Sequence, residues 1–180
     1  MGQSVGDYAA YRQRMLEEGL EYQDFVQDVL GRYFGLNFST WSSQAYQQAR
    51  GEGKAQIEIK YDRIFRSTSR FWVEVSEKPP KSVSYIASGI NRPSMFYVMG
   101  DYKSIFLFPT RFLRRYRDAY LRQKKPFVEN STKTSQGFFL PMESAEKIAA
   151  ALIIRVPDGW ELNEKWQRHP GQLELLLQEV

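Results

Sequence analysis

Apolar residues in the N-terminal part of the chain recur at the three- and four-residue steps of a helix. The members of this stripe are Leu20, Phe25, Val26, Val29, Leu30, Tyr33 and Phe34. Gly35 follows the stripe directly and supplies a natural C-terminal stop. The pattern predicts a helix from about Asp7 to Phe34, and Gly19 is a point at which it could divide into a short leading helix and a longer one.

The period changes to two in the next patterned segments, residues 55–62 and 70–78, which alternate apolar and charged side chains. The segment between them is polar, so we predict two strands paired as a hairpin. Their apolar faces carry Ile57, Ile59 and Tyr61 in the first strand and Phe71, Val73 and Val75 in the second. Their opposite faces carry Glu58, Lys60 and Asp62 in the first strand and Trp72, Glu74, Ser76 and Lys78 in the second.

Shorter apolar runs follow this segment. They predict strands at residues 84–87, 95–99 and 105–108, and then a helix at residues 111–125. Residues 126–137 are predicted to form a polar loop, residues 144–154 an apolar helix and residues 173–177 a short final helix. This order predicts an α/β or α+β fold, in which helices flank a mixed central β-sheet and residues 1–180 form one domain.

The composition narrows the chemistry that the chain can perform. It has no cysteine, which excludes disulfides, thiolate metal ligands and a cysteine nucleophile. Its one histidine, His169, cannot build a catalytic triad or a zinc site of several histidines. A metal site would have to use carboxylates and carbonyls, which favours a hard cation such as Mg²⁺ or Mn²⁺.

The sequence has no pattern typical of a membrane protein or a secreted one. No apolar run approaches the ~20 residues that a transmembrane helix needs. The first residues, MGQSVGDYAAYRQR, lack the apolar core of a signal peptide. We therefore expect a cytoplasmic protein that does not associate with membranes.

Positive charge is concentrated in the middle of the chain. Residues 61–135 contain 15 Lys and Arg against 6 Asp and Glu, whereas the segments on either side are net negative. Such a surplus attracts polyanions such as nucleic acids. The candidate phosphate contacts are Arg92, Arg111, Arg114, Arg115, Arg122, Lys124 and Lys125. The alternative is an ordinary solvated basic helix.

The charged faces of the two predicted strands would form one patch if the strands pair. Two or three acids close together can hold a divalent ion, and a nearby lysine can stabilise developing charge or orient a water molecule. The alternative is that these faces simply meet solvent, as in many amphipathic antiparallel strands. The charged faces alone favour this alternative. The scarcity of histidine, the absence of cysteine and the basic middle segment, together with the family resemblance described next, favour the metal site.

An acidic helix residue, then Asp62, an 11-residue gap, Glu74 and Lys78 form an arrangement that resembles the PD-(D/E)XK, or restriction-endonuclease-like, nuclease superfamily. The resemblance extends over roughly residues 18–145. Within the superfamily, the chain is similar to small phage- or prophage-type members. It implies a restriction-endonuclease-like core in which two acids bind Mg²⁺ and a lysine assists the attacking water. Asp62 and Glu74 would hold the ion here, with Glu58 as a further ligand.

The chain departs from the motif of this superfamily at two positions. Tyr61 precedes the aspartate where the motif has proline, and Ser76 stands where it has lysine. Lys78, on the same predicted face, or Lys60, on the neighbouring strand, would then take the catalytic role. A competing register uses Glu58-Ile59-Lys60 as the acid-x-lysine element with Glu52 as the first acid, and ranks second because that gap is too short for a hairpin.

The helical acid that often completes such a site is assigned to Glu21, with Glu18 as the runner-up. Taken together, the resemblance implies a Mg²⁺-dependent endonuclease that hydrolyses phosphodiester bonds of duplex or branched DNA. It also implies a homodimer or higher homo-oligomer, because a duplex has two strands to cut. The alternatives are a non-catalytic nucleic-acid-binding module with the same fold and a structural or interaction protein.

Overall fold

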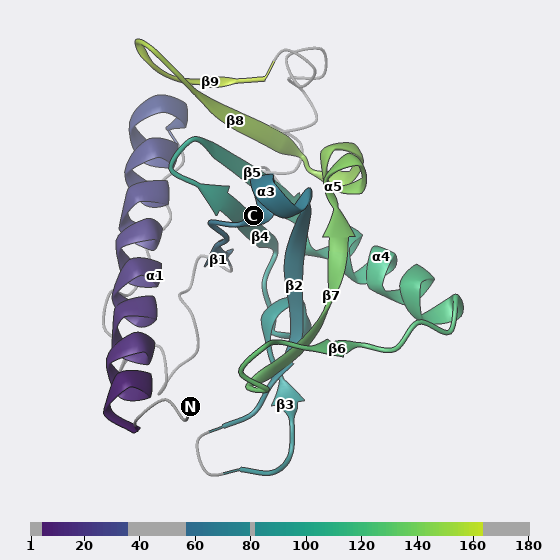
Figure 1. The fold of residues 1–180 in the computed structure, drawn as a ribbon. Helices are drawn as coiled ribbons and strands as arrows, with labels where there is room; N and C mark the ends of the chain where they lie inside the picture. Colours follow the sequence, from purple (N-terminus) through teal and green to yellow (C-terminus); the bar gives the residue numbers. More distant parts are fainter. Residues whose placement is uncertain (1–4, 36–56, 80–81, 164–180) are drawn as a thin grey trace.

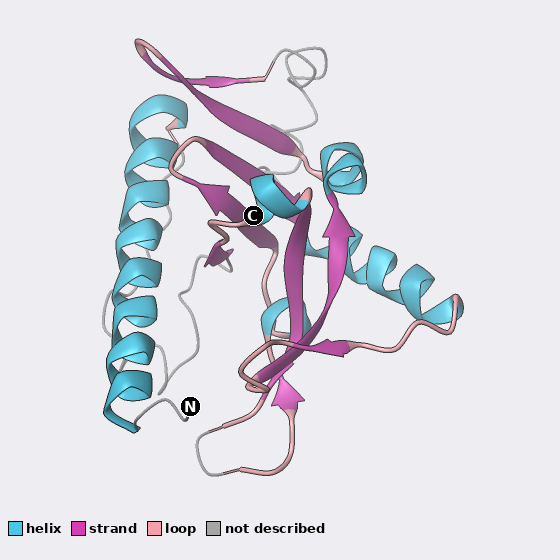
Figure 2. Cartoon of the chain, viewed as in Figure 1, coloured by secondary structure: helices cyan, strands magenta, loops and turns pink. Residues whose placement is uncertain are grey.

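The computed structural model describes residues 5–35, 57–79 and 82–163, which fold as a mixed α+β structure with two sheets and flanking helices (Figures 1 and 2). The helices are α1 (Val5–Phe34), α3 (Phe65–Thr68), α4 (Thr110–Arg122) and α5 (Met142–Ile148), with the 3₁₀ helix η1 at Gly89–Asn91. The strands are β1 (Ile57–Tyr61), β2 (Arg70–Glu77), β3 (Ile86–Ala87), β4 (Phe96–Asp101), β5 (Ser104–Pro109), β6 (Val128–Glu129), β7 (Ser135–Pro141), β8 (Ala151–Val156) and β9 (Gly159–Leu162).

The larger sheet has five strands in the order β1-β4-β5-β8-β9. β1 runs parallel to β4 and the other neighbours are antiparallel, so this sheet is mixed, as the sequence predicts. Parallel neighbours need a long connection, and here that connection carries β2 and β3 of the other sheet. In the β1–β4 ladder Glu58 lies opposite Tyr97 and Lys60 opposite Met99.

The smaller sheet has four strands in the order β3-β2-β7-β6, all antiparallel. Its longest ladder joins β2 to β7, from Arg70 opposite Pro141 to Glu77 opposite Ser135. A bulge interrupts this ladder between Glu74 and Ser76. Bulges bend a strand and change the direction of its side chains. This bulge directly follows Glu74, one of the acids that the sequence predicts as metal ligands.

Two hydrophobic clusters define the layers of the fold. One lies between α1 and the larger sheet and includes Val26, Leu30 and Ile59. The other joins the two sheets to α4 and α5 and includes Phe71 and Leu113. The helices α1 and α4 therefore lie on opposite sides of the molecule (Figure 1).

The alternation of side chains in β1 places its charged face between the two sheets. Ile57 and Ile59 belong to the cluster under α1. Because neighbouring strand residues point to opposite faces, Glu58 and Lys60 face the smaller sheet instead. Of the two charged side chains on this face, Glu58 is therefore buried and Lys60 is only partly exposed.

The predicted hairpin between residues 55–62 and 70–78 is wrong. Both strands form, but β1 pairs with β4 and β2 pairs with β3 and β7. The connection between them folds as α3, whose Phe65 is buried and stacks on Phe71 at 4.5 Å between ring centroids. Ser69 then takes a left-handed conformation (φ 53°) and directs the chain into the second sheet.

The predicted helix at residues 144–154 is also wrong in its second half. α5 ends at Ile148, and Ala151–Val156 is β8, which pairs with β5. The predicted loop at 126–137 contains β6 and the start of β7, and α1 runs through Gly19 without dividing. The helix predicted at residues 173–177 lies outside the described residues, and none of the described helices has the length and apolarity that crossing a bilayer requires.

Candidate functional site

Glu58 and Lys60 form an ion pair on the inner face of β1. The Nζ atom of Lys60 is 2.6 Å from Oε1 of Glu58. The Glu58 side chain is 2% exposed and that of Lys60 is 36% exposed, so the carboxylate is buried while part of the lysine side chain reaches solvent. Burial lowers the pKa of Lys60, but the nearby carboxylates of Glu58 and Glu74 outweigh it and hold that pKa above its ordinary value. Lys60 is therefore a protonated hydrogen-bond donor at neutral pH.

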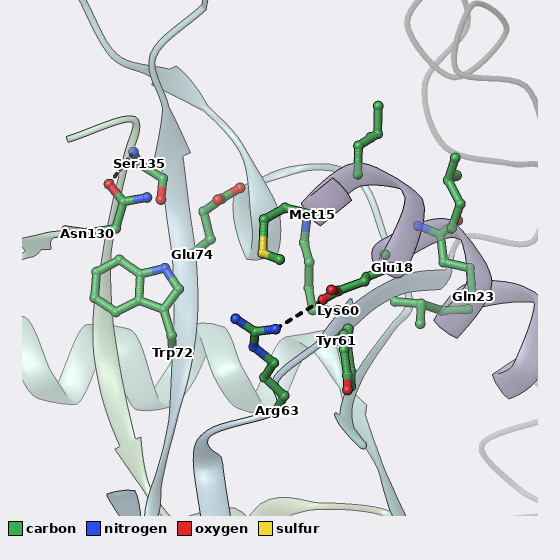
Figure 3. A pocket seen from close by; sticks show the side chains of 14 residues that line it. Met15, Glu18, Gln23, Lys60, Tyr61, Arg63, Trp72, Glu74, Asn130 and Ser135 are labelled. Atoms are coloured by element: carbon green, nitrogen blue, oxygen red, sulfur yellow. Dashed lines mark hydrogen bonds and ion pairs between the residues drawn. The ribbon is translucent and has the colours of Figure 1, made fainter. Parts of the chain in front are cut away.

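Glu74 approaches the same ammonium from the smaller sheet. It lies on β2 directly before the bulge, and its Oε1 atom accepts a hydrogen bond of 2.7 Å from the buried hydroxyl of Ser88. Figure 3 shows Glu74 and Lys60 among the side chains of one cleft. Lys60 thus pairs with Glu58, and Glu74, from the other sheet, adds the influence of a second carboxylate on the same ammonium.

The segment Ser88–Asn91 holds the bulge in place. The Val75 carbonyl, which lies within the bulge, accepts hydrogen bonds from Ser88 N at 3.1 Å and Asn91 Nδ2 at 2.9 Å. Gly89 between them has φ +53°, and a Cβ atom there would lie 2.2 Å from the carbonyl oxygen of Glu74. Only glycine fits this close approach, which fixes the backbone that presents the Glu74 carboxylate.

Tyr97 contributes a hydroxyl to the same cluster from β4. The residue is fully buried and lies opposite Glu58 in the β1–β4 ladder. Burial raises the pKa of Tyr97, and the charges of Lys60 and Glu58 act on it with opposite signs. The phenol is therefore neutral beside the charged groups.

A cleft of about 560 Å³ opens beside the Lys60 and Glu74 side chains. α1 lines one side and residues of β2 and the β6–β7 segment line the other, with the end of β1 and the residues after it between them (Figure 3). The lining residues are Met15, Leu16, Glu18, Gly19, Leu20, Gln23, Ile59, Lys60, Tyr61, Arg63, Trp72, Glu74, Asn130 and Ser135. The volume is within the range of sites that hold small ligands.

The acidic residue of α1 that lines this cleft is Glu18, the second choice of the sequence analysis. Its Oε2 atom lies 3.3 Å from Nη1 of Arg63, and Oε1 lies 3.9 Å from Nε of Arg14. Glu21, which the sequence ranked first, is exposed and does not line the cleft. The two positions are about one helical turn apart, and the sequence pattern alone does not decide which of them faces the sheet.

Asp62 is placed as a backbone cap. Its Oδ1 atom accepts a hydrogen bond from Ile64 N at 3.1 Å, and Oδ2 accepts one from Trp72 N at 3.3 Å. These bonds join the end of β1 to the start of α3 and to β2. Burial raises the pKa of Asp62 despite these donors. Both carboxylate oxygens of Asp62 are used by backbone N–H groups, and Asp62 does not line the cleft, so the predicted pairing of Asp62 with Glu74 as metal ligands does not fit its contacts.

Replacement of Asp62 by asparagine should therefore leave the activity of the site largely unchanged. The amide oxygen of the asparagine would keep an acceptor for the turn, and we expect any activity to stay within about tenfold of wild type. Because a raised pKa makes the ionised acid unfavourable, wild-type stability falls relative to the asparagine variant as pH rises from about 3 to 7. Thermal unfolding at several pH values and an activity assay check both statements. A loss of activity by several orders of magnitude would restore Asp62 as a ligand.

Lys78, the first choice for the catalytic lysine, lies beyond the end of β2 and away from the cleft. Its Nζ atom is 4.7 Å from the centroid of the Tyr85 ring. Its backbone N–H donates to the carbonyl of Thr134 at 2.7 Å. The bulge after Glu74 contributes to this outcome because it breaks the alternation by which Lys78 was assigned to the face of Glu74.

The predicted phosphate contacts fall into two groups. Arg114 is structural: its Nε and Nη2 atoms donate to the carbonyls of Ile90 and Arg92, both at 2.7 Å, and hold η1 against α4. The Arg92 side chain pairs with Glu77. The exposed members of the group are Arg111, Arg115, Arg122, Lys124 and Lys125, and none of them lines the cleft.

The charges at the cleft suit a hard cation. Glu74 lines the cleft, and Glu58, which is buried and does not line it, pairs with the lining residue Lys60, so two carboxylates act on one ammonium. The Ser88 hydroxyl donates to Glu74. Mg²⁺ sites commonly use one or two carboxylates, with substrate phosphate and water as the other ligands. Among the described residues no group of three or more His, Cys, Asp and Glu converges, so the fit is to a site of two carboxylates.

Comparison of the chain with family models, with curated proteins and with solved structures finds no match. The function of the protein must therefore be inferred from the geometry of the site. Sequence reasoning named Glu58, Lys60 and Glu74 as candidates but missed Ser88, Tyr97 and Arg63. Nothing in the local pattern marks those three, because long-range packing brings them to the site.

Proposed function

We propose that the protein is a metal-dependent nuclease whose site is formed by Glu58, Lys60 and Glu74. The observation that carries the proposal is the charge cluster at the cleft: protonated Lys60 pairs with Glu58, and the Glu74 carboxylate, which lines the same cleft as Lys60, also acts on that ammonium. In this arrangement Glu58-Ile59-Lys60 is the acid-x-lysine element, as in the competing register of the sequence analysis. That register takes Glu52 as its first acid, a residue outside the described part of the chain, and the second acid here is Glu74 instead. The restriction-endonuclease-like core is part of this proposal.

The charge balance of the cluster supports cation binding. Two carboxylates and one ammonium leave a net negative charge in a partly buried site, and such charge is costly unless it is compensated. A divalent cation held by Glu74 and Glu58 would provide the compensation. When bound, it would activate water and neutralise charge on a phosphodiester.

Lys60 acts as a cation in this proposal. Its raised pKa keeps Nζ protonated, so it cannot accept a proton from water at neutral pH. It can donate hydrogen bonds to an attacking water or to a phosphate oxygen, and the Glu58 contact fixes the direction of its side chain. Ser88 and Gly89 set the position of the second carboxylate.

The cluster also resembles a purely structural ion pair, which favours the non-catalytic nucleic-acid-binding module as the second candidate. The specific observation is that Glu58 is almost completely buried and already paired. Buried ion pairs can be retained for structural specificity alone. A cytoplasmic location and a homodimer or higher oligomer stay predictions of the sequence.

Incubation with supercoiled plasmid DNA and with circular single-stranded DNA tests the proposal. We expect cleavage with Mg²⁺ or Mn²⁺, no cleavage with chelator, and recovery of cleavage when excess metal is restored. Product on an agarose gel over a time course gives the rate. Absence of cleavage of both DNAs with both metals would exclude the nuclease and leave the binding module.

A further inference from the structure

The two sides of the cleft differ in chemistry. The α1 side presents apolar atoms of Met15, Leu16 and Leu20, and the opposite side presents the indole of Trp72. Figure 3 shows Trp72 and Met15 apart from each other, with Glu74 and Arg63 drawn between them and Lys60 next to Met15. An aromatic ring and an apolar wall in this arrangement suit a flat, weakly polar group with a charged attachment.

The Trp72 ring is held in position from behind. It contacts the Phe139 ring at 5.2 Å between centroids, and its Cζ2 atom crosses close to Gly137, where a Cβ would lie 3.0 Å away. The backbone N–H of Trp72 donates to Asp62 at 3.3 Å. A large aromatic side chain that is only partly buried and fixed in this way provides a ready stacking surface.

Two cations, Lys60 and Arg63, line the same cleft as the Trp72 ring. Lys60 belongs to the candidate catalytic cluster, and Arg63 follows it closely in the chain. Arg63 is exposed and its charge is balanced in the free protein by Glu18 across the cleft at 3.3 Å. Guanidinium groups bind phosphate oxygens well, so an incoming phosphate would compete with Glu18 for Arg63.

We propose that this cleft binds an unpaired segment of a DNA strand, with one base stacked on Trp72 and the adjoining phosphate near Lys60 and Arg63. The inference rests on the proposed nuclease function and assigns single strands, flaps or frayed ends as its substrate class. A continuous duplex does not fit, because its base faces are covered by neighbouring bases unless one is flipped out. A cleft of about 560 Å³ has room for one nucleotide, not for a duplex.

The same geometry predicts low selectivity among bases. Stacking on an aromatic ring tolerates every base. The amide of Asn130, which also lines the cleft, is committed to its own turn: Oδ1 accepts from Thr134 N at 2.8 Å and Ser135 N at 3.2 Å, and Nδ2 donates to Thr134 Oγ1 at 3.0 Å. The Asn130 amide therefore has few hydrogen-bonding positions left with which to recognise the edge of a base.

Fluorescence anisotropy with a labelled oligothymidylate tests the inference in chelator, where no cleavage interferes. The comparison ligands are a hairpin duplex and an oligonucleotide of the same length with abasic sites. We expect the oligothymidylate to bind about tenfold more tightly than either. Trp72→Leu should lose about tenfold of that affinity and Trp72→Phe should retain most of it, because stacking needs a ring.

Matched variants separate the cleft from general effects. Trp160→Leu removes a tryptophan that lies on β9 against Phe25, and Arg70→Gln removes a cation that stacks on Phe139 outside the cleft lining. We expect both to bind as wild type does, while Arg63→Gln weakens binding. Equal affinity for duplex and single strand, or for abasic and normal strands, would overturn the inference even if Trp72→Leu does not fold.

The binding and cleavage experiments can fail separately. Tight single-strand binding in chelator without cleavage in either metal would reject the nuclease and keep the unpaired strand as the ligand of a binding module. Cleavage with equal affinity for duplex and single strand would keep the nuclease and reject the unpaired strand.

Discussion

Replacement of Glu74 by Gln is expected to reduce metal-dependent cleavage on the order of 10³-fold while the protein stays folded. Gln can still accept the hydrogen bond that Ser88 donates, so the local structure should persist. It cannot supply the negative charge that a divalent cation needs. Cleavage rates at saturating Mg²⁺ and Mn²⁺, together with thermal unfolding, measure the two effects separately.

The matched control for this change is Glu77→Gln on the same strand. Glu77 pairs with Arg92 and does not line the cleft. Its replacement should leave cleavage within about tenfold of wild type, which is the scale of a modest perturbation. Ser88→Ala, which removes a hydrogen bond that positions Glu74, should have an intermediate effect of about 10- to 100-fold. Equal activity of Glu74→Gln and wild type would remove Glu74 from the site.

The elements that the sequence predicted well are those with a strong local pattern. The apolar stripe from Leu20 to Phe34 gives α1, and the buried runs near Val98 and Leu107 give β4 and β5. The basic amphipathic segment gives α4, with Leu113 buried on its inner face. These four elements are recognised by which face of the helix or strand is apolar, and the spacing of apolar residues in the sequence shows that face directly.

Strand pairing was not predictable in the same way. β1 and β2 are close in sequence and similar in pattern, which favoured a hairpin. Their separation depends on Phe65, which anchors α3 in the core, and on Ser69, whose left-handed backbone turns the chain. A phenylalanine and a serine at these positions do not by themselves predict an anchored helix or a left-handed turn. The error also hid the burial of Glu58, because a charged strand face was expected to meet solvent.

The apolar run at 144–154 shows a second limit. Ala145 and Ile148 fit helical spacing, and the following Ile153 continues the apolar character without a break. The structure divides the run at Ala149, whose extended backbone (φ −65°, ψ 138°) starts the path into β8. Periodicity cannot distinguish a short buried strand from a helix end, and only pairing with β5 decides it.

The candidate site was predicted in part for the same reasons. Glu58, Lys60 and Glu74 were all named, but as members of one hairpin face with Asp62 and Lys78. The structure keeps the three together through the Glu58–Lys60 ion pair and the nearby Glu74 carboxylate, although β1 and β2 belong to different sheets. Asp62 lies in the turn before α3, and the bulge after Glu74 changes the face on which Lys78 lies. Alternation of apolar and charged residues in the sequence reveals neither the turn nor the bulge.

Lys60→Met should abolish most of the cleavage, by about 10²- to 10⁴-fold, because the site loses the hydrogen-bond donor cation that pairs with Glu58. Met keeps much of the length and volume of the lysine stem. The control is Lys78→Met, which removes the lysine that the motif spacing favoured and should leave cleavage unchanged. Loss of cleavage in Lys78→Met but not in Lys60→Met would reverse the assignment of the lysine.

Lys60→Met should also destabilise the fold, because it leaves the buried Glu58 carboxylate without its partner. Breaking a buried pair in this way costs roughly 3–5 kcal/mol, and solvent access to the 36%-exposed Lys60 should reduce this to about 2–3 kcal/mol. The double variant Glu58→Gln/Lys60→Met removes the orphaned charge and should recover at least half of that loss, as urea unfolding would measure. It should not recover cleavage. Recovery of cleavage together with stability would show that the pair serves the fold alone, whereas stability without cleavage assigns the charges of Glu58 and Lys60 to the chemistry.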